Sequence, residues 1–523
     1  KLRTIVKIAI TSSVVLLCSG FALYSFFRLS AAEGQKDFNL YELVPSTTSA
    51  VFVTDDVLEF VAEVDELTCS KNQQYLYVSK LFSYLKQSLY ALSEDTPHGL
   101  SRQMNQMLIS FHEPDNERNQ VLYCRLGNGD KELVNRFVRK YISSLYPPKT
   151  FIYKGEEIII YPMADGDFLA CYLTSDFMAL SFQKKLIENV IDAYKSGKSL
   201  ADDSTFTGIR APKKSAAAAT IYTRMQGMMG WTEFDMKMKD DFIYFSGITH
   251  DADTCFAFIN QLRQQQSVKG FPGEVLPSTA FYFSRQGITD WVSLLSYGNA
   301  QGQSVPARTS EVQNRDKEFS RYLMENAGQD LVACLFQRED TLQGAAAVLS
   351  LSVADVTEAE RMLRALVNAA SADEGRRNPR ITFCYTVNKA YPIYRLPQTT
   401  LFEQLTSFAE PTLDVYAAFY GGRLLLAPDA DALAHYIRQL DKGEVLNGAM
   451  AYQTGMDHLS DSYHFMLMAD FDHIFQQSEN HVRFVPDFFL RNADFFRHFT
   501  LFVQFACADG MVYPNIVLKY KSE

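Results

Sequence analysis

The residues best suited to chemistry lie in the segment "ADFDHIF", which brings together Asp470, Asp472 and His473, with His464 and His481 nearby. If this segment were a strand, the two aspartates would share one face and present two carboxylates to a cation. The alternative is a polar turn or a helix start, where one aspartate accepts backbone hydrogen bonds. We favour the turn or helix start, because a lone histidine without a paired ligand is more often structural than metal-binding.

Two short pairs allow similar alternatives. Asp240 and Asp241 offer two carboxylates for acid–base work, and Gly421 with Gly422 would let the backbone approach an anion. Both pairs separate strand-like runs, so a tight hairpin turn explains them more simply. The sequence contains no phosphate loop, dinucleotide fingerprint, nucleophile elbow, zinc-protease motif or calcium-binding loop. We therefore expect a protein that is not an enzyme, with no catalytic residue, no cofactor site and no metal site.

The composition is that of a globular protein. With 523 residues, 47% hydrophobic and 21% charged, the chain is long enough for two domains. Its net charge of -11 argues against a nucleic-acid partner. The 8 cysteines form no CxxC pair, and several lie in apolar runs such as "FLACYL" and "LVACLF". We expect mostly free thiols, although an exported domain also permits disulfides.

A charge-free apolar run extends from Ile8 to Phe27, and such a run is long enough to cross about 30 Å of hydrocarbon as a helix. Lys1, Arg3 and Lys7 precede it, so the positive-inside bias keeps the N-terminus in the cytoplasm and exports the remaining chain to the periplasm. A cleaved signal peptide is the alternative, but its apolar core is usually only about 7–15 residues long. We predict a single-pass anchor in the inner (cytoplasmic) membrane. Residues of this predicted anchor are Ile8, Val14, Leu17, Phe21 and Phe27.

Two stretches of the sequence resemble each other. "LVPSTTSAVFV" begins at Leu43 and "VLPSTAFYFS" begins at Val275, and each places a proline before an alternating, strand-like run. Further blocks match in the same order: 106–126 with 331–351, 166–200 with 412–446, and 220–225 with 465–471. In the 166–200 pair, the helix of each copy ends at a glycine, Gly197 or Gly443, as a left-handed C-cap requires. These matches predict an internal duplication.

The predicted fold class is α+β, with an N-terminal transmembrane helix followed by two tandem, duplicated modules of mostly antiparallel sheet with packing helices. We place the module boundary in the Gly- and Pro-containing segment 266–275 and expect the polar stretch 298–318 to be a surface loop. Thr357 and Glu360 form a capping-box pattern at the start of a helix. The predicted domains are 1–30 (cytoplasmic stub and transmembrane helix), 31–270 (first module) and 271–523 (second module, with a helical insertion near 475–498).

The segment 481–499 concentrates aromatic and basic residues. One interpretation is a helix that packs into the core. The other is a face that binds a partner or a membrane surface, because aromatic residues and arginine are enriched at interfaces. The candidate partner-binding residues are Phe488, Phe489, Arg491, Phe495, Phe496 and Arg497.

Three pieces of the chain together resemble a known family. They are the start from Val44 to Thr47, the hairpin and helix from Gly166 to Leu200, and the segment from Asp203 to Phe206. This pattern is similar to bacterial envelope proteins grouped as domain-of-unknown-function family 3352, and it covers most of the exported region in outline. The resemblance implies an extracytoplasmic, membrane-tethered protein and supplies no catalytic residue.

Two functional hypotheses follow. The first is a non-enzymatic, membrane-anchored scaffold or accessory subunit, which binds other membrane or envelope proteins through its periplasmic modules and the bilayer through residues 8–27. The second is a periplasmic ligand-binding protein or hydrolase that uses a groove between the two modules, since pockets favour domain interfaces. The sequence favours the scaffold, without identifying its partners, because function resides in sites and the sequence contains no recognisable site.

Overall fold

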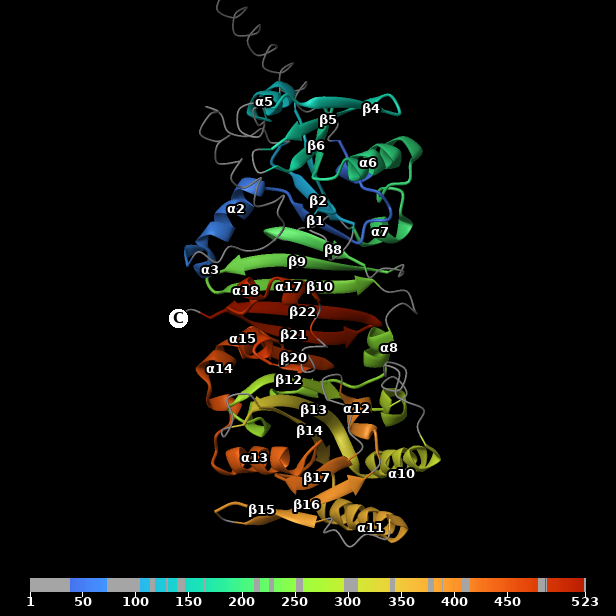
Figure 1. The fold of residues 1–523 in the computed structure, drawn as a ribbon, viewed down its shortest axis with the longest axis vertical. Coiled ribbons are helices and arrows are strands. Elements are labelled where there is room, and N and C mark those ends of the chain that lie inside the picture. The colour runs from blue at the N-terminus through green and yellow to red at the C-terminus, as the bar shows by residue number, and fades with distance from the viewer. Residues whose placement is uncertain are drawn as a thin grey trace, which may run out of the picture.

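An antiparallel sheet of 20 strands, counted among the described residues, extends along the longest axis of the molecule (Figure 1). The structure is a computed structural model. It describes residues 38–72, 104–112, 118–127, 130–138, 146–163, 166–210, 217–224, 230–250, 257–295, 309–338, 344–374, 381–387, 389–397, 399–406, 414–477, 485 and 487–521. The mostly antiparallel α+β class is as predicted.

The first half of the chain forms one half of the sheet. Hydrogen-bonded registers place its strands in a continuous order. From the outer edge inward these are β4 (Lys149–Tyr153), β5 (Glu156–Pro162), β6 (Phe168–Leu173), β7 (Phe177–Ser181), β3 (Gln120–Arg125), β2 (Met107–Phe111), β1 (Ala50–Thr54), β8 (Ala219–Thr223), β9 (Trp231–Lys239) and β10 (Phe242–His250).

The second half follows the same plan from the opposite edge. Its strands, from the outer edge inward, are β15 (Ile381–Tyr385), β16 (Ala390–Pro397), β17 (Asp414–Tyr420), β18 (Arg423–Ala427), β14 (Ala345–Val353), β13 (Ala327–Gln337), β12 (Ala280–Gly287), β20 (Phe465–Asp470), β21 (Phe499–Ala508) and β22 (Met511–Tyr520). A separate small pair joins β11 (Val268–Lys269) to β19 (Ser462–Tyr463).

The two halves meet through their inner strands. β10 and β22 pair antiparallel, with Phe242 opposite Lys519 and Thr249 opposite Val512. Each of these strands is the last of its half, so equivalent strands face each other across the join (Figure 1).

The segment that leads into the first strand of each half, here called the entry segment, is held in the same way in both. Pro45 forms an isolated antiparallel bridge with Ser199, and Pro277 forms one with Val445. The amide of Leu200 donates to the carbonyl of Val44 at 2.8 Å, and that of Leu446 donates to Leu276 at 2.9 Å. The repeated Pro-Ser-Thr stretches therefore dock beside the segment that follows a helix-ending glycine.

Successive residues of the strands face two different hydrophobic layers. Leu424 and Leu426 belong to a core that spans both halves, whereas Leu425 and Ala427 belong to a core whose buried members lie in the second half and against which Phe242 and Tyr244 of β10 pack. In the first half, Met178 likewise joins the spanning core while Ala179 joins a separate local core. This alternation follows from the pleat of a strand, which sends neighbouring side chains to opposite faces.

Helices cover both faces of the sheet. Those packed on the spanning core are α2 (Val57–Glu66), α3 (Thr68–Lys71), α5 (Asp130–Phe137), α10 (Ser310–Asn326), α11 (Val356–Glu374), α12 (Leu401–Leu405), α15 (Phe471–Phe475), α17 (Asp487–Arg491) and α18 (Ala493–Phe496). Those on the local cores are η1 (Leu40–Glu42), α6 (Lys184–Ser196), α7 (Ser204–Ile209), α13 (Ala430–Asp441), η4 (Leu446–Gly448) and α14 (Met450–Met456). The remaining elements are α8 (Ala257–Arg263) and η3 (Pro272–Val275).

Helix α6 follows β7, and α13 follows β18, the equivalent strand of the second half. Gly197 is the C-cap of α6, and Gly443 directly follows Lys442, the C-cap of α13; the two glycines have φ of 63° and 76°, in the left-handed region. This confirms the predicted glycine C-caps, because only glycine enters that region without a steric cost.

Two local predictions are wrong. Residues 310–318 are not loop, since α10 begins at Ser310, is capped by Thr309 and buries Val312 and Phe319 at helical spacing. Polar and charged residues dominate 298–318, and Phe319 lies just beyond this stretch, so the helical spacing was not recognised. At the start of α11, Asp355 accepts the backbone hydrogen bonds from Thr357 and Glu358, so the expected cap at Thr357 lies two residues too late.

The predicted membrane anchor, with Ile8, Val14, Leu17, Phe21 and Phe27, lies outside the described residues. Within the described parts of the chain, no helix combines the length and apolarity needed to cross a bilayer.

Candidate functional site

The carboxylates suggested by the sequence are structural in this fold. Asp470 caps the N-terminus of α15 by accepting a hydrogen bond from the amide of Asp472 at 3.1 Å. It also lies 2.6 Å from Lys521 and 3.3 Å from His473. Burial by itself would raise the pKa of Asp470, but its bonds to His473 and Lys521 hold it below the ordinary value. The helix-start prediction is confirmed, and the two aspartates do not share a strand face.

The paired turn residues are also where the hairpin interpretation places them. Asp240 and Asp241 connect β9 to β10, with Asp240 at a φ of 51°. Gly421 and Gly422 connect β17 to β18 with φ of 56° and 78°. Positive φ values at the tip of a two-residue hairpin match the right-handed strand twist.

The aromatic segment turns most of its described rings inward. Phe489 stacks on Phe471 at 4.9 Å between centroids, Phe496 is buried, and Phe495 packs against the spanning core. Arg491 and Arg497 are exposed, and Arg497 lies 3.7 Å from Asp472. The side chain of Phe488 lies outside the described residues. Partner binding by this segment stays a prediction, with the two arginines as its exposed part.

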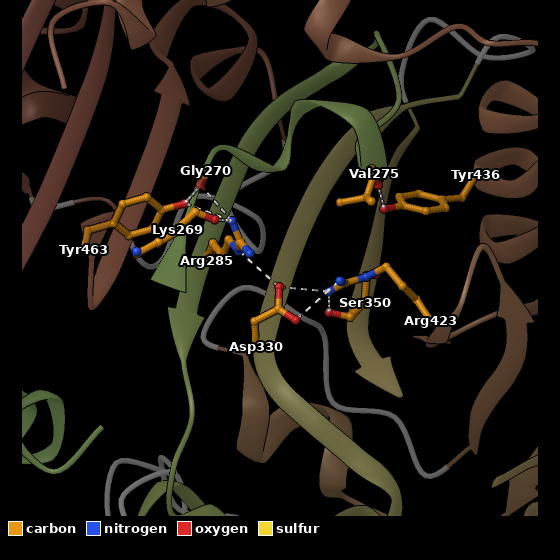
Figure 2. Close-up of polar contacts among 9 residues, drawn as sticks. All are labelled: Lys269, Gly270, Val275, Arg285, Asp330, Ser350, Arg423, Tyr436 and Tyr463. Carbon is orange, nitrogen blue, oxygen red and sulfur yellow. Dashed lines mark hydrogen bonds and ion pairs between the residues drawn. The ribbon is translucent and has the colours of Figure 1, made fainter. Parts of the chain in front are cut away.

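The sequence did not predict a cluster of charges on one face of the second half (Figure 2). Asp330 on β13 lies between two arginines, with Arg285 Nε at 3.1 Å and Arg423 Nη2 at 3.4 Å from its Oδ2 atom. Arg423 also donates to the hydroxyl and the carbonyl oxygen of Ser350. We call Arg285, Asp330 and Arg423 the ion cluster.

The ion cluster is largely buried, with side-chain exposures of 16%, 9% and 14% for Arg285, Asp330 and Arg423. Burial alone would raise the pKa of Asp330, but Arg423, a hydrogen bond from Ser352 and Arg285 hold it below its ordinary value. The carboxylate is therefore charged at neutral pH and is poorly suited to proton transfer. Removing one member of such a buried set is strongly destabilising, because the others lose their counter-charge.

The ion cluster anchors the entry segment of the second half. Arg285 Nη1 donates to the carbonyl oxygens of Lys269 and Gly270, at 3.2 and 2.8 Å. The hydroxyl of Tyr463 donates to the same Gly270 carbonyl at 2.8 Å (Figure 2). Two backbone acceptors of the chain between the halves are thus satisfied by a side chain that Asp330 holds in place.

A signal for the ion cluster was present in the sequence, because Arg285 and Asp330 are charged residues inside or beside apolar strand runs. Their proximity was not visible, since β12, β13 and β18 are far apart along the chain and become neighbours only in the sheet.

A cavity of about 370 Å³ lies between α10 and α11. Its lining combines charged side chains, among them Arg321, Glu325 and Arg361, with apolar ones such as Leu366. It belongs to the second half alone and is therefore not the groove between modules that the alternative hypothesis invokes.

The cysteines of the described residues carry free thiols, as predicted. Burial raises the pKa of Cys124 and of Cys171 to about 12, and it also raises the pKa of Cys384. Because the thiolate is the reactive form, these thiols are poor nucleophiles at neutral pH. No group of side chains with metal-ligand geometry occurs among the described residues.

The two outer edges of the sheet expose large apolar side chains. On β4, Ile152 is 71% exposed, and Phe383 on β15 is 53% exposed. Neither strand has a partner on its outer side among the described strands. An edge strand of this kind offers unpaired backbone groups to another chain.

Compared with protein-family models, curated proteins and solved structures, the chain has no match. The resemblance to the envelope family therefore stays a prediction.

Proposed function

We propose that this protein is a non-enzymatic, membrane-anchored scaffold of the bacterial envelope, whose exported part docks partner proteins on the edges of its sheet. The anchor is the apolar run 8–27, with the N-terminus in the cytoplasm and the bulk of the chain in the periplasm. The observation that carries the proposal is the exposed apolar surface on β4 and β15, at opposite ends of the long sheet (Figure 1).

We also propose that the exported part consists of two duplicated modules fused edge to edge. The common strand order supports this, and so do the matching contacts of Pro45 with Ser199 and of Pro277 with Val445. Fusion through β10 and β22 gives a rigid platform, because one hydrophobic core continues across the join. A long, stiff sheet with accessible ends suits a protein that holds partners at a defined spacing.

Edge strands support docking for a physical reason. An extended segment of a partner can add to an open sheet edge, so that main-chain hydrogen bonds supply affinity and alternate side chains supply specificity. Exposed Ile152 and Phe383 would then be covered on binding, and their removal from water would stabilise the complex.

Purification of the anchored protein from native membranes, followed by mass spectrometry of companion proteins, tests the proposal. We expect defined companions with the wild type and their loss in Ile152→Lys or Phe383→Lys, because a buried lysine at the edge opposes docking. Leu58→Lys is the control, since Leu58 is exposed on helix α2, away from both edges. A wild-type particle without companions contradicts the scaffold, and companions retained in both edge variants contradict the edges as the docking site.

A further inference from the structure

One face of β15 and of the turn after it forms an apolar stripe. Ile381, Phe383, Tyr385 and Val387 alternate along the chain and are 39%, 53%, 72% and 97% exposed. Cys384 points the other way and is buried against the local core of the second half. Alternate residues of a strand share a face, so Ile381, Phe383 and Tyr385 form a continuous surface along the outer edge, and the exposed Val387 lies in the turn that follows.

The stripe also lacks charge. Residues 381–387 read "ITFCYTV", with no acidic or basic side chain, in a protein whose net charge is -11. An uncharged edge can approach an identical edge without like-charge repulsion. Most other parts of this acidic surface would repel a second copy of themselves.

The opposite edge differs in this respect, because its charge lies within the strand, whereas the charges nearest to β15 in the sequence, Arg380 and Lys389, flank the stripe. β4 begins with the exposed Lys149, and the ammonium of Lys184 lies 5.2 Å from the ring centroid of Phe151. Lysines at an edge strand discourage pairing with another sheet, because pairing would bury them. Among the two outer edges, β15 is therefore the one suited to self-pairing.

The chain itself provides the geometry for such pairing. Its two halves join through equivalent strands, β10 and β22, which run antiparallel and keep one hydrophobic core continuous across the join. A two-fold axis perpendicular to the sheet at the middle of β15 would repeat this arrangement between two copies. Phe383 of one copy would then lie beside Phe383 of the other, and both stripes would lie on the same face.

We propose that two copies of this protein associate through antiparallel pairing of their β15 strands, which extends the sheet from one copy into the next. This inference rests on the proposed scaffold function and identifies the occupant of one edge as a second copy. An interface of this type is isologous and closes at a dimer, since the same strand is used by both copies. The β4 edges stay at the two far ends of the dimer, where they are free for other partners.

Sedimentation velocity of the full chain in detergent, over a concentration series, tests the inference. We expect a dimer for the wild type and a monomer for both Phe383→Lys and Tyr385→Lys, because each variant buries like charges at the two-fold axis or beside it. Ile152→Lys is the matched control on β4 and stays a dimer. Circular dichroism accompanies each variant, and since all three side chains are exposed we expect wild-type spectra. Thermal melts are compared at concentrations where the wild type is also monomeric, because association itself raises the melting temperature.

A wild type that is monomeric at every concentration overturns the inference, as does a dimer that persists in both β15 variants. Loss of the dimer in Ile152→Lys as well overturns the assignment to β15. Mass spectrometry of companion proteins distinguishes a failure of self-pairing from a failure of the scaffold proposal. A monomer that retains companions contradicts self-pairing alone, whereas a monomer without companions contradicts both proposals.

Discussion

The two halves of the sheet share the bridges at Pro45 and Pro277, and in both an arginine donates to entry-segment carbonyls, Arg224 in the first half and Arg285 in the second. They differ in what holds the start of the segment. Phe38 and Gly270 precede Pro45 and Pro277 by the same distance along the chain. In the first half, the ring of Phe38 packs on Phe177 with 4.8 Å between centroids. In the second half, the carbonyl of Gly270 accepts hydrogen bonds from Arg285 and Tyr463.

The strand registers show that the same positions of the frame carry these different contacts. Arg285, Asp330 and Arg423 in the second half correspond to Val53, Gln106 and Phe177 in the first. The same sheet topology therefore accepts apolar packing at these positions in one half and a buried ion cluster in the other. A buried ion cluster requires that its charges and the backbone acceptors beside it are fully satisfied. The two halves should differ in how they respond to core truncation, to charge removal and to acid.

The largest loss of stability is expected in the first half, at the ring that packs on Phe38. Phe177→Ala removes a fully buried ring that contacts Phe38, Tyr172 and Tyr194. We expect the free energy of unfolding to fall by about 4 kcal/mol, from lost burial and a residual cavity. Urea denaturation measures this loss, with the exposed Phe168→Ala as the control. A loss under about 1 kcal/mol would contradict the apolar anchoring of the first half.

Removing the charge of Asp330 in the second half is expected to lower the stability nearly as much. Asp330→Asn keeps the shape of the side chain but leaves Arg285 and Arg423 without their shared counter-charge. We expect a loss of about 3 kcal/mol in the free energy of unfolding. Gln106 occupies the equivalent position in the first half, and Gln106→Ala breaks a hydrogen bond to the exposed Asp55. This variant should lose less than about 1 kcal/mol in the free energy of unfolding. Equal losses in the two variants would show that the ion cluster is unimportant.

Acid should weaken the second half through the same carboxylate. The pKa of Asp330 is lower in the folded protein than its ordinary value, so the unfolded chain, with a carboxyl pKa of about 3.9, binds the proton more readily. The stabilisation is fully present above that unfolded pKa and is lost as the pH falls through the lower folded one. We expect the melting temperature of the wild type to fall more steeply below about pH 4 than that of Asp330→Asn. Identical slopes would contradict this assignment.

The smallest loss of stability is expected from replacing the helix-ending glycines, and it should be the same in both halves. Gly197→Ala and Gly443→Ala each place a side chain at a positive φ, where no neighbouring atom lies within 4 Å of the added methyl. The cost is backbone strain alone, about 1 kcal/mol in each case. Gly208→Ala in α7 is the control, since Gly208 has open space and no positive φ. Thermal melts that differ between the first two variants would indicate that their C-caps are not equivalent.

Much of the local structure was predictable because it depends on short-range chemistry. Alternating apolar runs located strands such as β1 and β12, and the pairs Asp240–Asp241 and Gly421–Gly422 located the turns between β9 and β10 and between β17 and β18. The helix-ending Gly197 and Gly443 were recognisable because only glycine takes that conformation readily. Helix α10 was missed because its apolar positions are sparse among charged ones.

The ion cluster and the outer edges depend on contacts between distant segments. Arg285, Asp330 and Arg423 lie on strands that become neighbours only when the sheet assembles. The apolar side chains of β15 look like core residues in the sequence, and their exposure follows from the position of this strand at the end of the sheet.

The sequence by itself determined the periodicity of the strands, the turns, the helix C-caps and the repeated Pro-Ser-Thr starts. These features depend on backbone geometry and on side-chain patterns within a few residues. The tertiary structure decided which strands are neighbours, which of them end the sheet, and whether the start of an entry segment contacts an aromatic ring or an arginine. Those outcomes depend on register and burial across the whole sheet, because the same side chain is core on an inner strand and exposed surface on an outer one.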